Sequence, residues 1–278
     1  WMGICHGWAP AAIMEPRPQK SVSVKSSDGT WNIRFNPSEI KGLLSYSWAN
    51  NRFQSATLGQ RCNRQNPQRD ENGRLTDPEC FDLNPAIWHL AIVHKLGISH
   101  QSFVMDATFD YEVWNQPVIS YSYSYFNPKT KESTDSLSEA TVSLDQFPED
   151  IFSKYRSSNS KRVVGIEMSV GYTIETSANS LDTDSPDADA IRWVKYKYDL
   201  ELDSKDKIVG GEWYDYYHPD FIWTPKVGEK ALSPLDLLLN VEDWHESEPL
   251  PAAWSKAAKS RSSQGVMLNT IAEGILRR

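Results

Sequence analysis

The chain has 278 residues and a formal net charge of -8, with a pI of about 5.3 and a mean hydropathy of -0.56. This length can bury one large core or two small ones. The acidic balance without a Lys/Arg cluster excludes a typical nucleic-acid-binding protein, and no apolar run is long enough for a spanning helix, so we expect no membrane insertion.

The first predicted element is a short helix over Cys5 to Met14, which Pro16 ends. Cys5 at its start is flanked by Gly3 and Gly7, whose small size leaves room for a substrate carbonyl. A helix N-terminus stabilises a thiolate, and the thiolate is the reactive form of cysteine. Cys5 is therefore a candidate nucleophile; an ordinary buried cysteine is the alternative.

A hairpin and a second helix are predicted next. The alternating runs 22–24 and 31–35 flank Asp28-Gly29, a pair suited to a tight turn. Asn36-Pro37-Ser38-Glu39 predicts a capped helix start, and the helix continues through Trp48.

Cys62 and Cys80 bracket a polar, turn-rich segment that has little core of its own. A disulfide between them would stabilise the protein by about 3 kcal/mol by restricting the unfolded chain. Two reduced cysteines in a cytosolic protein are the alternative. If this disulfide forms, Cys5 is the remaining cysteine and carries a reactive thiol.

A thiol nucleophile needs a base and a group that orients the base. Residues 87–97 are compatible with a helix or a strand, and residues 102–108 predict a strand that contains Asp106. Two neighbouring strands would place His89 beside Asp106, as base and orienter. His94 and Asp110 form a rival pair, and a hydrogen-bonded, half-buried histidine is the alternative for His89.

The second half of the chain is rich in predicted strands. Residues 120–125 alternate Tyr and Ser, which places three tyrosines on one strand face and three serines on the other. Alternating runs at 163–176 and 190–202 predict two long strands, and 208–216 pairs back after a turn. Residues 232–278 are helical in pattern.

Two polar loops are candidates for calcium, which prefers carboxylate and carbonyl oxygens. One is the acidic loop 182–189, and the other contains Asp70, Asn72 and Asp77. The acidic loop lacks the glycine and terminal glutamate of an EF-hand, and a solvated loop is the alternative reading of both.

Trp8, Trp88 and Trp114 lie close in sequence to the candidate catalytic residues. Aromatic walls suit a narrow tunnel for an extended glutamine or lysine side chain, which makes these three residues candidates for substrate binding. They suit a plain core equally well.

Several segments resemble the oomycete-type transglutaminases of the transglutaminase elicitor family, as a bacterial or other distant homologue would. Residues 111–118 read Tyr-Glu-Val-Trp-Asn-Gln-Pro-Val and are similar to the start of the family's elicitor peptide, and residues 3–11 resemble its active-site segment. Further similar stretches are 84–89, 103–108, 212–213 and 218–221. The resemblance spans roughly residues 1–223. Within it, the match to the elicitor peptide ends after Val118, where the oomycete peptide continues Arg-Gly-Phe-Lys.

The resemblance implies a protein-glutamine γ-glutamyltransferase that forms isopeptide bonds between glutamine and lysine side chains through a cysteine thioester. It assigns Cys5 as nucleophile, His89 as base and Asp106 as orienter. It also implies a secreted or extracellular setting, the periplasm included, with protein substrates and calcium dependence. No other cofactor is required for the chemistry.

The expected fold is α+β with a papain-like core, in which a helix carrying the cysteine packs on an antiparallel sheet carrying the histidine and aspartate. We expect a catalytic part at 1–130, a strand-rich part at 131–250 and a helical tail at 251–278. The alternatives are a papain-like cysteine protease and a non-catalytic secreted interaction protein. Because only four residues precede Cys5, we expect an N-terminal pro-segment or a second chain to supply the second oxyanion donor, with Trp1 at a maturation cut or a truncation.

Overall fold

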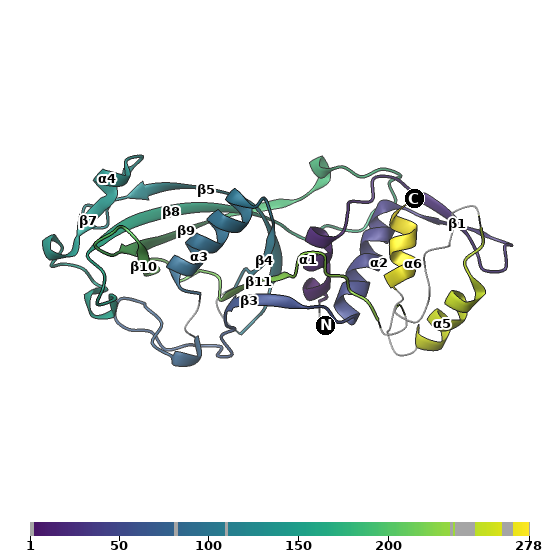
Figure 1. Ribbon diagram of the computed structural model, residues 1–278, viewed down its shortest axis with the longest axis horizontal. Coiled ribbons are helices and arrows are strands. Elements are labelled where there is room, and N and C mark those ends of the chain that lie inside the picture. The colour runs from purple at the N-terminus through teal and green to yellow at the C-terminus, as the bar shows by residue number, and fades with distance from the viewer. Residues whose placement is uncertain are drawn as a thin grey trace. The chain divides into compact units, whose positions relative to one another are not determined.

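The computed structural model describes residues 3–80, 83–108, 111–233, 236, 248–262 and 269–277. The chain forms two compact units, unit 1 with Trp1–Ala56, Ile174–Ala190 and Thr224–Arg278, and unit 2 with Thr57–Thr173 and Ile191–Trp223 (Figure 1). Each unit combines segments that are distant in sequence, whereas the expected parts 1–130, 131–250 and 251–278 are continuous. Those boundaries stay a prediction.

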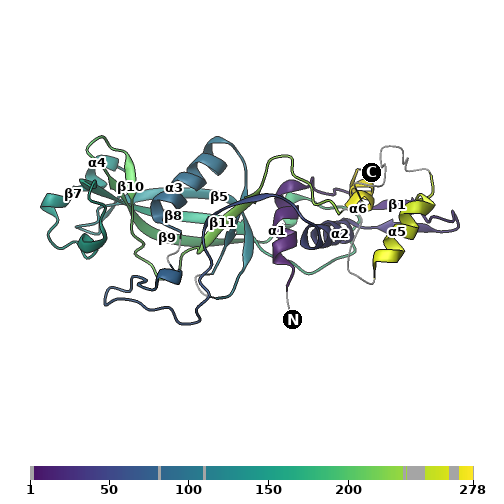
Figure 2. The same cartoon turned by 60° about the horizontal axis from the view of Figure 1, so that its bottom comes forward.

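Unit 1 consists of helices and one short hairpin (Figure 2). Its helix α2 has the predicted start, because the side chain of Asn36 accepts the N–H of Glu39 and the side chain of Glu39 accepts the N–H of Asn36. The predicted first helix and the hairpin are also confirmed. The elements are α1 (Cys5–Met14), β1 (Val22–Lys25), β2 (Asn32–Phe35), α2 (Pro37–Asn50), η5 (Pro186–Ala188), α5 (Ala252–Ser262) and α6 (Asn269–Leu276).

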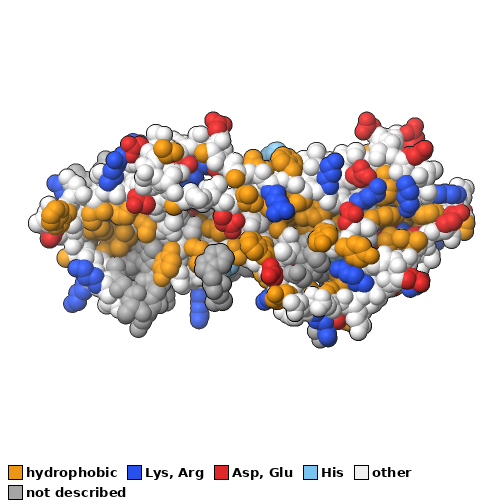
Figure 3. Space-filling model, turned by 180° about the vertical axis from the view of Figure 1, so that it is seen from behind, with side chains coloured by type: hydrophobic (Ala, Val, Ile, Leu, Met, Phe, Trp, Pro, Cys, Tyr) orange, Lys and Arg blue, Asp and Glu red, His pale blue; other side chains and the backbone are white. Residues whose placement is uncertain are grey.

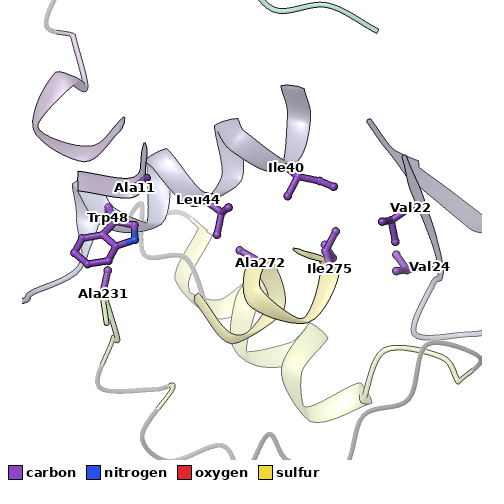
Figure 4. Close-up of a cluster of buried hydrophobic side chains, with 9 residues drawn as sticks. All are labelled: Ala11, Val22, Val24, Ile40, Leu44, Trp48, Ala231, Ala272 and Ile275. Carbon is purple, nitrogen blue, oxygen red and sulfur yellow. The ribbon is translucent and has the colours of Figure 1, made fainter. Parts of the chain in front are cut away.

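The core of unit 1 forms around one face of α2 (Figure 4). Ile40, Leu44 and Trp48 recur every four residues, so they share this face, and all are buried. Side chains from α1, the hairpin and α6 complete the cluster, which contains Ala11, Val22, Val24, Ala231, Ala272 and Ile275.

Gly7 allows α1 to approach α2 closely. A Cβ atom at this position would lie 2.4 Å from the carbonyl oxygen of Ser45 and 2.5 Å from Cβ of Ala49. The expectation that Gly7 leaves room for substrate is therefore wrong on this side, because α2 fills the space. At Gly3 a Cβ atom would meet nothing within 4 Å.

Unit 2 is built on a sheet in the order β10-β9-β8-β5-β4-β11-β3, with β6 on β5 and β7 on β8. The two predicted long strands of the second half are confirmed as β8 and β9, which pair antiparallel along their whole length. The strands are β3 (Ser55–Gly59), β4 (Phe103–Asp106), β5 (Asn115–Phe126), β6 (Ser133–Thr134), β7 (Thr141–Ser143), β8 (Arg162–Thr173), β9 (Ile191–Leu202), β10 (Ile208–Gly210) and β11 (Phe221–Pro225).

The helical segments of unit 2 are short. They are α3 (Pro85–Ile92), its π-helical continuation η2 (Val93–Ile98), α4 (Leu137–Ala140) and the 3-10 turns η1 (Pro78–Cys80), η3 (Leu144–Gln146) and η4 (Ser153–Tyr155). The chain thus has a mixed α and β fold with an antiparallel sheet. The papain-like arrangement of its core stays a prediction.

The two faces of β5 differ as the Tyr/Ser alternation predicts. On the tyrosine face, the ring of Tyr123 lies 5.3 Å from that of His89 on α3. On the same side, Trp88 of α3 lies edge-on to Tyr196 of β9 at 5.5 Å. Ser122 on the opposite face is exposed. Tyr123 is itself 41% exposed, so α3 covers the tyrosine face of β5 only in part.

Charged side chains of both signs are interspersed on the face shown in Figure 3. Arg156 differs from these surface charges, because its side chain is only 5% exposed. Its guanidinium donates two hydrogen bonds to the carboxylate of Asp199, at 2.6 and 2.7 Å, and two to that of Asp150, at 2.9 and 3.1 Å. This buried ion-pair cluster ties η4 to β9.

Candidate active site

Cys5 is the first residue of α1 in unit 1 and is half-buried. The carbonyl of Ile4 accepts the N–H groups of Gly7 and Trp8 at 2.8 and 3.0 Å, which closes the first turn behind the cysteine. Cys5 carries a thiol, because the disulfide joins the other two cysteines.

Trp8 lies one turn after Cys5 on the same helix face. Its indole Nε1 donates a 2.8 Å hydrogen bond to Oε1 of Glu175, which also belongs to unit 1. The indole is half-buried, so it can border a ligand at Cys5. Its role in substrate binding stays a prediction.

The predicted disulfide between Cys62 and Cys80 is confirmed. Both cysteines are buried with Leu75 in a small cluster of their own. The disulfide also anchors the neighbouring chain, because the N–H of Cys62 donates a 2.9 Å hydrogen bond to the buried carboxylate of Asp220, and the guanidinium of Arg61 donates to the carbonyl of Tyr111.

His89 lies on α3, so the expectation that a strand of the sheet carries it is wrong. Asn84 caps this helix by accepting the N–H of Ala86 at 2.9 Å, and Pro85 occupies its first position. These start signals outweigh the strand propensity of the apolar residues that follow.

The imidazole of His89 is buried and lies 2.8 Å from the hydroxyl of Tyr198 through Nδ1. Burial lowers the pKa of His89 to about 4, so the ring is neutral at pH 7. The hydroxyl of Tyr198 remains protonated, because burial raises its pKa far above the ordinary value.

Asp106 ends β4 and is fully buried. Its Oδ1 accepts the N–H and hydroxyl of Thr108 and the N–H of Trp114, at 3.2, 2.8 and 2.9 Å. Among the described residues, its Oδ2 is buried without a hydrogen-bond partner. Burial raises the pKa of Asp106, against the hydrogen bonds, which lower it.

The structure gives the three predicted catalytic residues separate surroundings. Cys5 belongs to unit 1, whereas His89 and Asp106 belong to unit 2. Within unit 2, His89 pairs with Tyr198 and Asp106 with Thr108 and Trp114, so the triad stays a prediction. Of the rival pair, His94 lies in η2 and is exposed, and Asp110 lies outside the described residues.

The other two predicted substrate-binding tryptophans differ in exposure. Trp88 is fully buried and packs edge-on against Phe103 at 6.2 Å, in the aromatic core of unit 2. Trp114 is 45% exposed, and its Nε1 donates a 3.0 Å hydrogen bond to Glu112. The surroundings of Trp88 are those of the plain-core alternative, and Trp114 retains an open ring face.

The acidic loop 182–189 does not fit a calcium site. Asp184 pairs with Arg17 at 2.6 Å and with Lys41 at 2.7 Å, and Asp189 also pairs with Arg17. Basic side chains thus occupy the carboxylates that a cation would need.

The second calcium candidate does not fit either. Asp70 accepts the hydroxyl of Tyr155 at 2.7 Å and two backbone N–H groups, and Asp77 pairs with Arg64. Within the described ranges, no group of three or more His, Cys, Asp or Glu side chains is arranged to hold a metal ion.

Sequence reasoning missed two partners, Tyr198 and Glu175. The alternation of β9 puts Tyr198 on the same face as Tyr196, which predicts burial for both. Nothing in the sequence pairs Tyr198 with a histidine 109 positions earlier, or Glu175 with a tryptophan 167 positions earlier.

The model of the transglutaminase elicitor family matches residues 1–237. The chain belongs to this family. Among solved structures it is similar to the GP42 transglutaminase from Phytophthora sojae, with 28% sequence identity and a TM-score of 0.58. The similarity covers 84% of this chain and 58% of that chain, so this member of the elicitor family spans little more than half of its structural relative.

Comparison with curated protein sequences finds no match. Within the described part of this elicitor-family chain, no helix combines the length and apolar character that crossing a membrane requires. The family match and the structural similarity together indicate an enzyme-like fold.

Proposed function

We propose that this chain is a protein-glutamine γ-glutamyltransferase with Cys5 as its nucleophile. The observation that carries the proposal is the position of Cys5 at the first turn of α1, in a chain that the family model matches from residue 1. A half-buried thiol at the start of a helix is accessible to a substrate carboxamide and suits nucleophilic attack on it.

The proposed first half-reaction forms a thioester. Neutral His89 takes the proton of the Cys5 thiol, and the sulfur attacks the γ-carbonyl of a protein glutamine. The backbone N–H of Cys5 donates to the oxyanion that develops. Collapse of the tetrahedral intermediate breaks the C–N bond, and imidazolium of His89 returns the proton to the leaving ammonia.

The second half-reaction transfers the acyl group to a lysine. Its neutral amine attacks the thioester carbonyl, His89 takes a proton from the attacking nitrogen, and the C–S bond breaks to leave an isopeptide bond. Protonation of the Cys5 thiolate by His89 restores the starting state. Asp106 is proposed to stabilise the imidazolium through Oδ2, the oxygen that has no partner among the described residues.

Protein substrates bearing glutamine and lysine, and a secreted or extracellular location, belong to the same proposal. The Cys62–Cys80 disulfide supports the location, because disulfides persist mainly in oxidising compartments. No step requires a metal, and the two loops considered for calcium do not fit one.

The test is incorporation of a labelled primary amine into a glutamine-bearing protein, with and without calcium. Cys5→Ala should abolish incorporation, and His6→Ala should retain it, since His6 is exposed and adjacent to Cys5. Peptide-bond cleavage without incorporation would instead identify a cysteine protease. A folded protein without any thiol-dependent reaction would contradict both enzyme functions and leave the non-catalytic interaction protein.

A further inference from the structure

The segment between β8 and β9, residues 174–190, forms a strap that belongs to unit 1. Arg17 binds it through Asp184 and Asp189, and Lys41 adds a third ion pair through Asp184. The hydroxyl of Ser21 donates a 2.8 Å hydrogen bond to Asp182. The acidic residues of the strap are therefore its attachment to the chain around α1 and α2.

Glu175 lies near the start of the strap and bonds the indole of Trp8. Oε1 of Glu175 accepts the Nε1–H of Trp8 at 2.8 Å, and side chains in a helix lean toward its N-terminus. The indole of Trp8 therefore covers the turn that carries Cys5. The hydrogen bond selects one orientation of a half-buried ring that could otherwise rotate about two side-chain torsions.

We propose that Glu175 is a positioning residue, which holds the Trp8 indole as a fixed wall beside the Cys5 thiol. The wall limits the directions from which a glutamine side chain reaches the sulfur, so its orientation decides how well the carboxamide is aligned for attack. The expected effect on acyl transfer rests on the proposed function, whereas the expected effect on the accessibility of the Cys5 thiol does not.

The chain contains a matched control for this contact. Nε1 of Trp48 donates a 2.8 Å hydrogen bond to Oε1 of Glu15, at the opposite end of α1 from Cys5. Glu15→Ala removes the same type of bond from the same unit, and Trp48 belongs to the core rather than to the cysteine. A general loss of stability would follow from both variants, and a loss of positioning only from Glu175→Ala.

The experiment measures kcat/KM for a glutamine peptide in amine incorporation. Glu175→Ala should lower it about tenfold, the range of one charge-assisted hydrogen bond, whereas Glu175→Gln should retain most of it because the amide oxygen still accepts. In a Trp8→Phe background, Glu175→Ala should have no further effect, and Glu15→Ala should leave kcat/KM unchanged. An equal loss in the Phe background, or equal losses for Ala and Gln, would overturn the inference.

A second readout does not depend on transfer. Alkylation of Cys5 by iodoacetamide, followed by peptide mass spectrometry, should be several-fold faster in Glu175→Ala than in the native protein, because the ring no longer shields the sulfur. Glu175→Gln and Glu15→Ala should react at the native rate. This result in a protein without transferase activity would reject the proposed function and retain the positioning role; an unchanged rate in Glu175→Ala would reject the positioning role.

Discussion

Nδ1 of His89 lies 2.8 Å from the hydroxyl of Tyr198, which joins helix α3 to strand β9. Both groups are buried, so neither can exchange the bond for water. Tyr198→Phe should lower the free energy of unfolding by about 1–3 kcal/mol, the cost of a buried polar group that loses its partner. Urea unfolding checks this, with Tyr196→Phe on the same strand face as control; equal losses would contradict the pairing.

The burial of His89 predicts a pH dependence of stability. Its pKa is about 4 in the folded chain and 6.5 ordinarily, so the unfolded chain binds the proton first as the pH falls. Stability is complete above pH 6.5 and declines from there toward pH 4. Between pH 7 and 5 this one group should cost about 2 kcal/mol.

His89→Gln should remove that part of the pH dependence while the carboxylates contribute equally to both proteins. Denaturant unfolding at pH 7 and 5 measures the difference. A variant with the same dependence as the native protein would show that His89 is protonated in the folded chain as easily as in the unfolded one.

Two substitutions of Asp106 should differ in their effect on stability but not in their effect on activity. Its Oδ1 accepts three hydrogen bonds, which fix the chain between Asp106 and Trp114. Asp106→Asn retains an oxygen acceptor and should cost less than about 1 kcal/mol of stability, whereas Asp106→Ala leaves these donors unsatisfied and should cost about 2–4 kcal/mol. If the proposed role is correct, both variants lose amine incorporation; an active Asn variant would contradict it.

Gly7 should tolerate no side chain. An added Cβ atom would lie within 2.5 Å of α2, so Gly7→Ala must separate the two helices and should cost about 1–3 kcal/mol. Gly3→Ala is the control, since its Cβ atom would meet nothing within 4 Å. Thermal unfolding of the two variants compares them directly, and similar melting temperatures would contradict the close approach.

Arg156→Met should be among the most damaging single changes in unit 2. It leaves the buried carboxylates of Asp199 and Asp150 without their cation. The loss of one partner from a buried ion pair costs about 3–5 kcal/mol of stability. Arg162→Met is the control, because its ion pair with Asp206 is solvent-exposed and should contribute about 1 kcal/mol or less. Urea unfolding measures both, and equal costs would contradict the burial effect.

The sequence by itself determined the features that depend on neighbouring residues. The helix of Cys5, the hairpin around Asp28-Gly29 and the cap at Asn36 follow from local backbone preferences, and all three are present, although the hairpin has a longer connection than a tight two-residue turn. The Cys62–Cys80 disulfide also followed, because a loop without a core needs a covalent closure.

Only the tertiary structure decided what those elements meet. His89 lies on a helix because Asn84 and Pro85 start one, and its partner is Tyr198, a residue that no local signal connects to it. The acidic loop was a candidate for calcium in the sequence, and the fold places Arg17 and Lys41 against it. Hydrogen bonds and ion pairs between distant segments depend on how the chain packs, and a single sequence contains the preferences of each segment but not the partner it finds.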